Sequence, residues 1–203
     1  MAKTTLIIGI GSTGLNIIEE AQQYHYEFIG KNKPGKNVEY LYLETDISNK
    51  SKSTAGGKSK INPVFVDFTD IDVDIKQYRK KMGPKVEWIP PVEYLESGNI
   101  GAGGMPAFGR LSMWKKYNFD NLKSTILNKF SAINGDSSTL IYVVGTLTGG
   151  TGSGLSVDIA YLLQEILPQC ANNIQALFLL PDEASFSKNK SLHENTFSAL
   201  SAI

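Results

Sequence analysis

Residues 145–154, which read GTLTGGTGSG, are the feature that most constrains this chain. The stretch before them, residues 139–144, is mainly apolar and typical of a buried strand, and residues 155–167 have the periodicity of an amphipathic helix. A glycine-rich turn between a strand and a helix exposes backbone N–H groups beside the positive end of the helix dipole. Its glycines also lack the Cβ atoms that would keep an anion away. We therefore predict a phosphate site, to which three hydroxyls add donors: Thr148, Thr151 and Ser153.

The segment 145–154 carries no lysine, so it is not the Walker phosphate loop, which needs a Lys and a Ser or Thr after its last glycine. A flexible hinge is the alternative interpretation of so many glycines. Residues 30–37 come closer to the Walker pattern, but Asn37 stands where that pattern requires Ser or Thr. A predicted strand also follows them in place of a helix, so we interpret residues 30–37 as a surface turn.

Strands and helices are predicted to alternate along the chain. The predicted strands are residues 6–10, 38–43, 64–68, 139–144 and 176–180, and the predicted helices are residues 13–26, 71–82, 155–167 and 191–203, with further helix within 106–132. Several of the strands are continuously apolar. This pattern predicts an α/β fold with a parallel, Rossmann-like sheet and helices on both faces. Four residues are expected to contact the core from the 106–132 region: Leu111, Met113, Trp114 and Tyr117.

Composition narrows the class of protein. The chain has 203 residues, 41% of them hydrophobic, which fits one globular domain with a sizeable core. Its 20 basic and 20 acidic residues balance, so a nucleic-acid or membrane surface is not expected as the main partner. Cys170 is the one cysteine and is expected to be structural. The apolar stretch at the start is too short for a membrane span or a secretory signal, and a cytoplasmic location is expected.

Two further glycine-rich segments lie earlier in the chain than residues 145–154. Residues 9–14 read GIGSTG and match the G-x-G-x-x-G dinucleotide fingerprint, and residues 101–104 read GAGG. On a Rossmann interpretation, Glu44 or Asp46 at the end of the second strand would bind a ribose, and the chain would be an NAD(P)-dependent oxidoreductase. The Rossmann fold does not require further glycine-rich segments after the first strand, such as those at residues 101–104 and 145–154. Since loops at the carboxyl ends of parallel strands gather at one edge, we expect three segments around one multi-phosphate nucleotide.

The three segments, taken in order, resemble those of the tubulin/FtsZ superfamily of GTP-binding cytoskeletal proteins. Residues 149–154 (GGTGSG) are similar to its signature, and residues 101–110 (GAGGMPAFGR) resemble the FtsZ loop that senses the γ-phosphate. Residues 11–16 (GSTGLN) look like the first phosphate loop, and Thr45 with Asp46 resembles the Thr-Asp pair of the superfamily. Ser12 and Thr13 stand where FtsZ has glycines, and residues 48–60 look inserted. The chain therefore resembles a divergent prokaryotic tubulin-like protein.

This resemblance implies GTP or GDP as the ligand, with Mg²⁺ held largely through water near Asp46. It also implies that Asn16 reaches toward the base and that Glu183 binds the ribose. The full set of expected nucleotide-binding residues is Gly11, Ser12, Thr13, Asn16, Asp46, Gly101, Ala102, Gly103, Gly104, Thr148, Gly149, Gly150, Thr151, Gly152, Ser153 and Glu183.

The resemblance also implies that residues 1–203 are a GTP-binding domain without the central helix and the carboxy-terminal activation domain. In the superfamily, an acidic loop from the next filament subunit completes hydrolysis, so no catalytic residue is assigned here and inefficient turnover is expected. Filaments are expected of the full-length protein. Without a central helix, self-association would involve Leu192, Phe197 and Leu200. A non-hydrolysing interaction module remains an alternative.

Overall fold

The computed structural model describes residues 3–29, 37–46, 63–65, 76, 80, 101–183 and 190–201. Its strands are β1 (Thr5–Ile10), β2 (Val38–Glu44), β3 (Pro63–Phe65), β4 (Leu140–Thr146) and β5 (Ile174–Leu179). Its α-helices are α1 (Gly11–Ile29), α4 (Pro106–Trp114), α5 (Lys116–Ala132), α6 (Gly150–Ile166) and α8 (Lys190–Leu200), and a 3-10 helix, η4, spans Pro168–Asn173.

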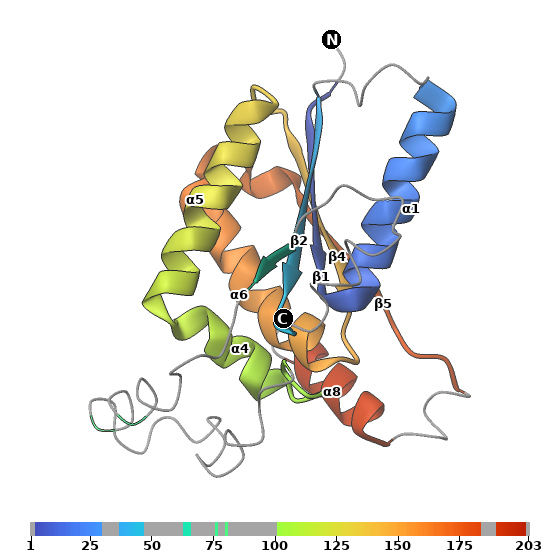
Figure 1. Ribbon diagram of the computed structural model, residues 1–203, viewed down its shortest axis with the longest axis vertical. Helices are drawn as coiled ribbons and strands as arrows, with labels where there is room; N and C mark the ends of the chain where they lie inside the picture. Colours follow the sequence, from blue (N-terminus) through green and yellow to red (C-terminus); the bar gives the residue numbers. More distant parts are fainter. Residues whose placement is uncertain are drawn as a thin grey trace.

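The strands form one sheet in the order β3-β2-β1-β4-β5, and every neighbouring pair is parallel. The first strand lies at the centre, with Ile8 opposite Leu41 of β2 and Val143 of β4. Figure 1 shows α1 on one face of the sheet and α4, α5 and α6 on the other. The predicted parallel α/β fold with helices on both faces is confirmed.

Alternation along the central strands divides the core into two layers. Leu6, Ile8 and Ile10 of β1 are fully buried toward α5 and α6, in a cluster that contains Ile126 of α5 and Ile159 of α6. The intervening side chains turn to the opposite face of the sheet, because successive residues of a strand point to opposite sides. There Ile7 and Tyr42 pack with Ile18 of α1. Because β1 is parallel to both β2 and β4, the carboxyl ends of these three strands lie at one edge of the sheet.

The predicted helical region 106–132 is two helices with a break at Lys115. Lys115 has an extended backbone conformation (φ −69°, ψ 116°), and the side-chain amide of Asn118 donates to the carbonyl of Ser112 in the last turn of α4. This bond satisfies a carbonyl that the end of a helix leaves without a partner. Leu111 and Met113 are buried as predicted, whereas Tyr117 is 70% exposed, so its predicted core contact is wrong.

The last strand is less covered than its apolar sequence predicts. Within β5, Leu177 and Leu179 are each 56% exposed, because no described helix packs on them at this edge of the sheet. On α8, Phe197 and Leu200 are 68% and 50% exposed. The continuous apolar pattern of residues 176–180 therefore predicts the strand correctly but its burial wrongly.

Several predicted features lie outside the described residues: the turn at 30–36, the loop at 48–60, most of the helix at 71–82, residues 66–68 of the third strand, and the side chain of Trp114.

Cys170 is buried in η4, where its thiol donates to the carbonyl of Asp136 (3.1 Å), and burial raises the pKa of the thiol. Among the described helices, none is long and apolar enough to cross a membrane.

Candidate functional site

A cavity of about 350 Å³ opens at the carboxyl ends of β1, β2 and β4. Parts of all three glycine segments meet there, as expected from the sheet. The residues that line the cavity are Ile10, Gly11, Ser12, Thr13, Glu44, Thr45, Asp46, Ala102, Gly103, Gly104, Thr146, Thr148, Gly149, Gly150, Thr151 and Gly152. A volume of this size lies within the range of sites for small ligands, roughly 300–1,000 Å³.

The glycine segment at residues 9–14 joins β1 to α1 without an intervening loop. The helix begins at Gly11 and not at Thr13 as predicted, and Gly11 has a positive φ of 69°, which glycine adopts without strain. A Cβ on Gly9 would lie 2.6 Å from the carbonyl oxygen of Gly14, so this pair of glycines allows α1 to pack directly on β1. The fingerprint glycines at 9 and 14 thus serve helix–strand packing, and Gly11 lies at the cavity.

The segment 145–154 is divided between a short turn and the start of a helix. Helix α6 begins at Gly150, five residues before its predicted start, and Gly149 is its N-cap. A Cβ on Gly152 would lie 2.1 Å from the Thr146 carbonyl oxygen, and one on Gly154 would lie 2.2 Å from that of Pro106. These helical glycines let α6 approach β4 and α4 closely. The absence of a Cβ at Gly152 and Gly154 is therefore required by helix packing, although Gly152 also lines the cavity.

Three other glycines do face open space. Among the residues that the structure describes, no atom lies within 4 Å of a Cβ added to Gly103, Gly104 or Gly149. Gly103 and Gly104 have positive φ values of 55° and 76°, whereas Gly149 is extended (φ −88°, ψ 162°). All three line the cavity. Their backbone groups can therefore be approached by a ligand without steric interference from a side chain.

Two helix N-termini contribute donors to the same cavity. Helices α1 and α6 begin at Gly11 and Gly150, and neither has an acidic residue in its first turn. No side chain caps the start of α6. The first N–H groups of a helix have no partner within the helix, and the helix dipole makes this end positive. The cavity is therefore suited to an anion.

Thr45, directly after β2, connects the 101–104 segment to the 145–154 segment. Its hydroxyl lies 2.5 Å from the hydroxyl of Thr151 on α6 and accepts a hydrogen bond from the backbone N–H of Ala102 (3.1 Å). Thr45 and Ala102 are buried. On Gly101, at φ 63°, a Cβ would lie 2.7 Å from that of Asp46. The 101–104 segment is thus packed tightly against the end of β2 at one side and open to the cavity at the other.

Glu44, the last residue of β2, is a buried carboxylate beside the cavity. It accepts hydrogen bonds from the hydroxyls of Tyr42 (2.5 Å) and Ser12 (3.5 Å) and from the backbone N–H groups of Thr45 (2.8 Å) and Asp46 (3.2 Å). Burial, together with the bond to Glu44, raises the pKa of Tyr42 far above the usual value for tyrosine. The oxygens of Glu44 thus hold the end of β2, Tyr42 and Ser12 together beside the cavity.

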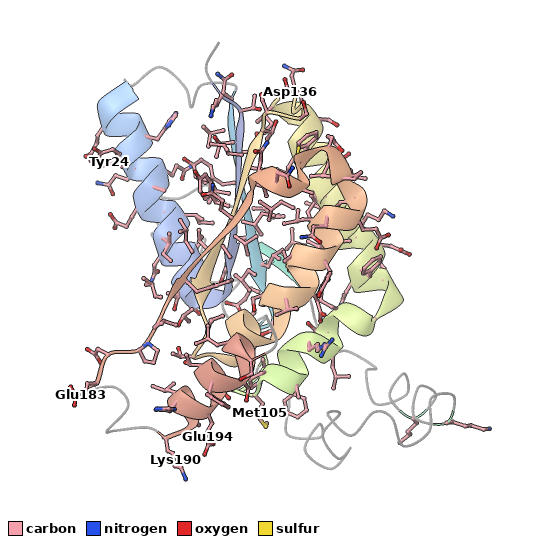
Figure 2. The ribbon with its side chains drawn as sticks, turned by 180° about the vertical axis from the view of Figure 1, so that it is seen from behind. Tyr24, Met105, Asp136, Glu183, Lys190 and Glu194 are labelled. Carbon is pink, nitrogen blue, oxygen red and sulfur yellow. The ribbon has the colours of Figure 1, made fainter. Side chains whose placement is uncertain are left out.

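Four of the predicted site residues do not line the cavity. Asn16 is exposed on the second turn of α1, and Gly101 lies behind the cavity wall against Asp46. The hydroxyl of Ser153 donates to the carbonyl of Gly149 within α6. Glu183 is exposed after β5, and Figure 2 shows it at the margin of the molecule.

Four lining residues are absent from the expected set of nucleotide-binding residues: Ile10, Glu44, Thr45 and Thr146. All four end a strand or directly follow one, so the position rule for parallel sheets could have found them. A charged residue at the end of the otherwise mainly apolar β2 was the signal for Glu44. Among the described residues, no group of three or more His, Cys, Asp or Glu side chains could hold a metal ion. Asp46, the predicted neighbour of Mg²⁺, lines the cavity together with Glu44.

Comparison with known proteins places these features in a family. Residues 6–203 match the protein family described as tubulin-like. No curated protein sequence matches the chain. The structure is similar to an empty FtsZ dimer from M. jannaschii, with a TM-score of 0.58, 17% identity, and coverage of 99% of this chain and 42% of that one.

Two other solved structures are similar to it. The GDP-bound CetZ1 monomer from Haloferax volcanii gives a TM-score of 0.65 at 15% identity and covers 98% of this chain and 47% of that one. TubZ from the Clostridium botulinum phage c-st gives 0.56 at 15% identity, with 98% and 46% covered. The chain thus spans less than half the length of these proteins, and at such identities they share its fold.

Proposed function

Because the chain belongs to the tubulin-like family, we propose that the cavity at the carboxyl edge of its sheet binds GTP or GDP. The observation that carries this proposal is the convergence of three glycine segments and two helix N-termini on one cavity. Phosphate oxygens accept hydrogen bonds from backbone N–H groups at such helix ends. The open space beside Gly103, Gly104 and Gly149 gives phosphates the close approach that this requires.

The proposed roles combine the positions of the residues in the cavity with what the family resemblance implies. The N–H groups at Gly11, Ser12 and Thr13 and those at Thr148, Gly149, Gly150, Thr151 and Gly152 would hold the inner phosphates. The segment Gly101–Gly104 would contact the terminal phosphate, with Gly101 acting from behind the wall. Asp46 would orient water on Mg²⁺, which neutralises phosphate charge when it is bound. We also propose that Asn16 contacts the base and that Glu183 contacts the ribose. Both residues must then approach the bound ligand.

For the whole protein we propose a cytoplasmic, filament-forming cytoskeletal role, with residues 1–203 as its nucleotide-binding domain. Two carboxylates, Glu44 and Asp46, line the cavity. The oxygens of Glu44 already accept hydrogen bonds from Tyr42 and from backbone N–H groups, which leaves it poorly placed to activate water. We therefore expect this chain alone to bind nucleotide and to hydrolyse it slowly. Steady release of phosphate from GTP by the purified chain would contradict that expectation.

Competition binding tests the proposal. The chain is titrated with fluorescently labelled GTP, and unlabelled GTP, GDP, ATP and NAD are added as competitors with and without Mg²⁺. Displacement by GTP and GDP but not by NAD supports the proposed site. Displacement by NAD alone would return the chain to the oxidoreductase interpretation. Absence of binding to every nucleotide would favour an interaction module that has the fold without the ligand.

A further inference from the structure

Helix α8 contacts two of the glycine segments through one side chain. The amide nitrogen of Asn195 donates to the carbonyl of Gly104 (2.7 Å) and to the carbonyl of Thr148 (2.8 Å). Asn195 itself does not line the cavity. In Figure 2, Glu194 beside it on α8 and Met105 beside Gly104 lie at the same end of the molecule. Asn195 therefore joins the two segments from outside the cavity.

The chemistry of this contact is specific to a primary amide. A side-chain NH₂ group has two hydrogens to donate, and here two carbonyl oxygens accept them. Aspartate has nearly the same shape as asparagine but, when ionised, only accepts hydrogen bonds. A carboxylate at position 195 would thus face two carbonyl oxygens and repel both.

The two carbonyls belong to segments with different proposed roles. Gly104 ends the segment proposed for the terminal phosphate, and Thr148 precedes Gly149, the N-cap of α6. The 101–104 segment is anchored at its start by the bond from Ala102 to Thr45. Gly103 and Gly104, at positive φ, lie in a turn closed by the hydrogen bond from the N–H of Met105 to the carbonyl of Ala102 (2.8 Å), and the Asn195 amide adds a bond to the carbonyl of Gly104.

Helix α8 is itself held by its inner face. Thr196 and Ala199 are buried, and the Thr196 hydroxyl donates to the carbonyl of Leu192 within the helix. Phe197 and Leu200 are exposed on the other side. Asn195 lies beside the buried face, so its amide stays at the two carbonyls only while α8 is docked.

We propose that Asn195 is a positioning residue, which sets the separation of the Gly101–Gly104 and Thr148–Gly149 segments and thereby makes the preference for GTP over GDP depend on the docking of α8. This inference rests on the proposed function. Thr148 is also held through its side chain, whose hydroxyl lies 2.9 Å from that of Thr146, whereas Gly104 has no side chain. We therefore expect loss of the amide to displace the Gly104 side more. The terminal phosphate is therefore affected more than the inner ones.

The first part of the test needs no nucleotide. Backbone hydrogen exchange is measured for the full 203-residue chain and for Asn195→Ala, Asn195→Asp and Ser198→Ala, the last being an exposed position on the same helix. Exchange in peptides covering residues 101–109 and 146–153 should be faster in both Asn195 variants, most in Asn195→Asp, and unchanged in Ser198→Ala. If either segment keeps its wild-type exchange in Asn195→Asp, the positioning role is refuted.

The second part measures dissociation constants for GTP and GDP. Asn195→Ala should weaken GTP about tenfold and GDP about threefold, corresponding to the loss of one or two hydrogen bonds. Asn195→Asp should be weaker still, although it fills the same space, and a side chain that acted by packing alone would leave Asp near the wild type. Equal weakening of GTP and GDP would contradict the proposal. If Asn195→Asp does not fold, Asn195→Ala decides both parts.

A wild-type chain that binds no nucleotide would refute the proposed function and, with it, the GTP preference. The exchange experiment would then still decide whether Asn195 positions the two segments.

Discussion

Two sets of glycines that look alike in the sequence do different work in this molecule. Gly152 and Gly154 lie inside α6, where an added Cβ would come within about 2 Å of a carbonyl oxygen of β4 or α4. Gly103, Gly104 and Gly149 face open space at the cavity. The first set allows elements to pack, and the second leaves backbone groups accessible to a ligand. A glycine motif is therefore partly a packing motif, and only the structure separates the two parts.

The largest effect is predicted for a substitution at one of the glycines that close packing of α6 requires. Gly152→Ala places a methyl group 2.1 Å from the Thr146 carbonyl oxygen, so α6 must move away from β4. We expect a loss of unfolding free energy on the order of 3 kcal/mol, measured by urea denaturation. Gly149→Ala is the matched control, and equal stability of the two variants would contradict the division.

A second prediction concerns the polar contact that joins the segments. Thr45→Val removes the hydroxyl that contacts Thr151 and accepts from the buried N–H of Ala102. An N–H left without a partner costs about 1–3 kcal/mol. We expect a stability loss of about 2 kcal/mol in urea denaturation. Ser198→Ala, at an exposed position on α8, is the comparison, and a silent Thr45→Val would refute the importance of this contact.

The third prediction tests one of the glycines that face open space at the cavity. Gly149 has an extended backbone that alanine also adopts, and its Cβ would meet no protein atom within 4 Å. Gly149→Ala should therefore change stability by no more than about 0.5 kcal/mol. Its methyl group would occupy space proposed for phosphate, and we expect GTP affinity to fall about tenfold, or about 1.4 kcal/mol. Unchanged affinity in fluorescence titration would remove Gly149 from the site.

The smallest predicted effect is a pH dependence behind the cavity wall. Because the pKa of Tyr42 is raised by burial and by Glu44, the folded chain keeps the phenol proton at pH values where the unfolded chain, with a tyrosine pKa of about 10, releases it. The folded state then binds more protons, so its stability falls as pH rises above about 10.

The check is urea denaturation of the wild type and of Tyr42→Phe between pH 8 and pH 11. Near pH 11 the wild type should lose about 1 kcal/mol more of its neutral-pH stability than Tyr42→Phe does. Parallel curves for the two proteins would contradict the raised pKa.

Much of the fold could be predicted from the sequence because the apolar runs of β1, β2 and β4 and the intervening helical periodicities are strong local signals. The parallel order then places the three glycine segments at one edge. Exposure of Leu177 could not be predicted, since burial of an apolar strand depends on what packs upon it. The two-helix division at Lys115 is accompanied by a hydrogen bond from Asn118 to the carbonyl of Ser112, six residues earlier, which the hydrophobic periodicity does not contain.

The site was predictable in position and less so in detail. The glycine spacing located the cavity, but the start of α6 at Gly150 was missed because glycine disfavours helices locally while close packing requires it here. Glu44 was named only as a ribose ligand of the alternative Rossmann interpretation, because its hydrogen bonds with Tyr42 and Ser12 form only in the folded chain. Asn195 carries no motif at all.

The most direct test of the central claim is a map of backbone amide shifts in the isotope-labelled chain on addition of GDP and Mg²⁺. The account predicts that the largest shifts fall on Gly103, Gly104 and Gly149 and at the first turns of α1 and α6. Shifts confined to another surface, such as the cavity beside Tyr24 and Val38 at the opposite end of the sheet, or no shifts at all, would contradict it.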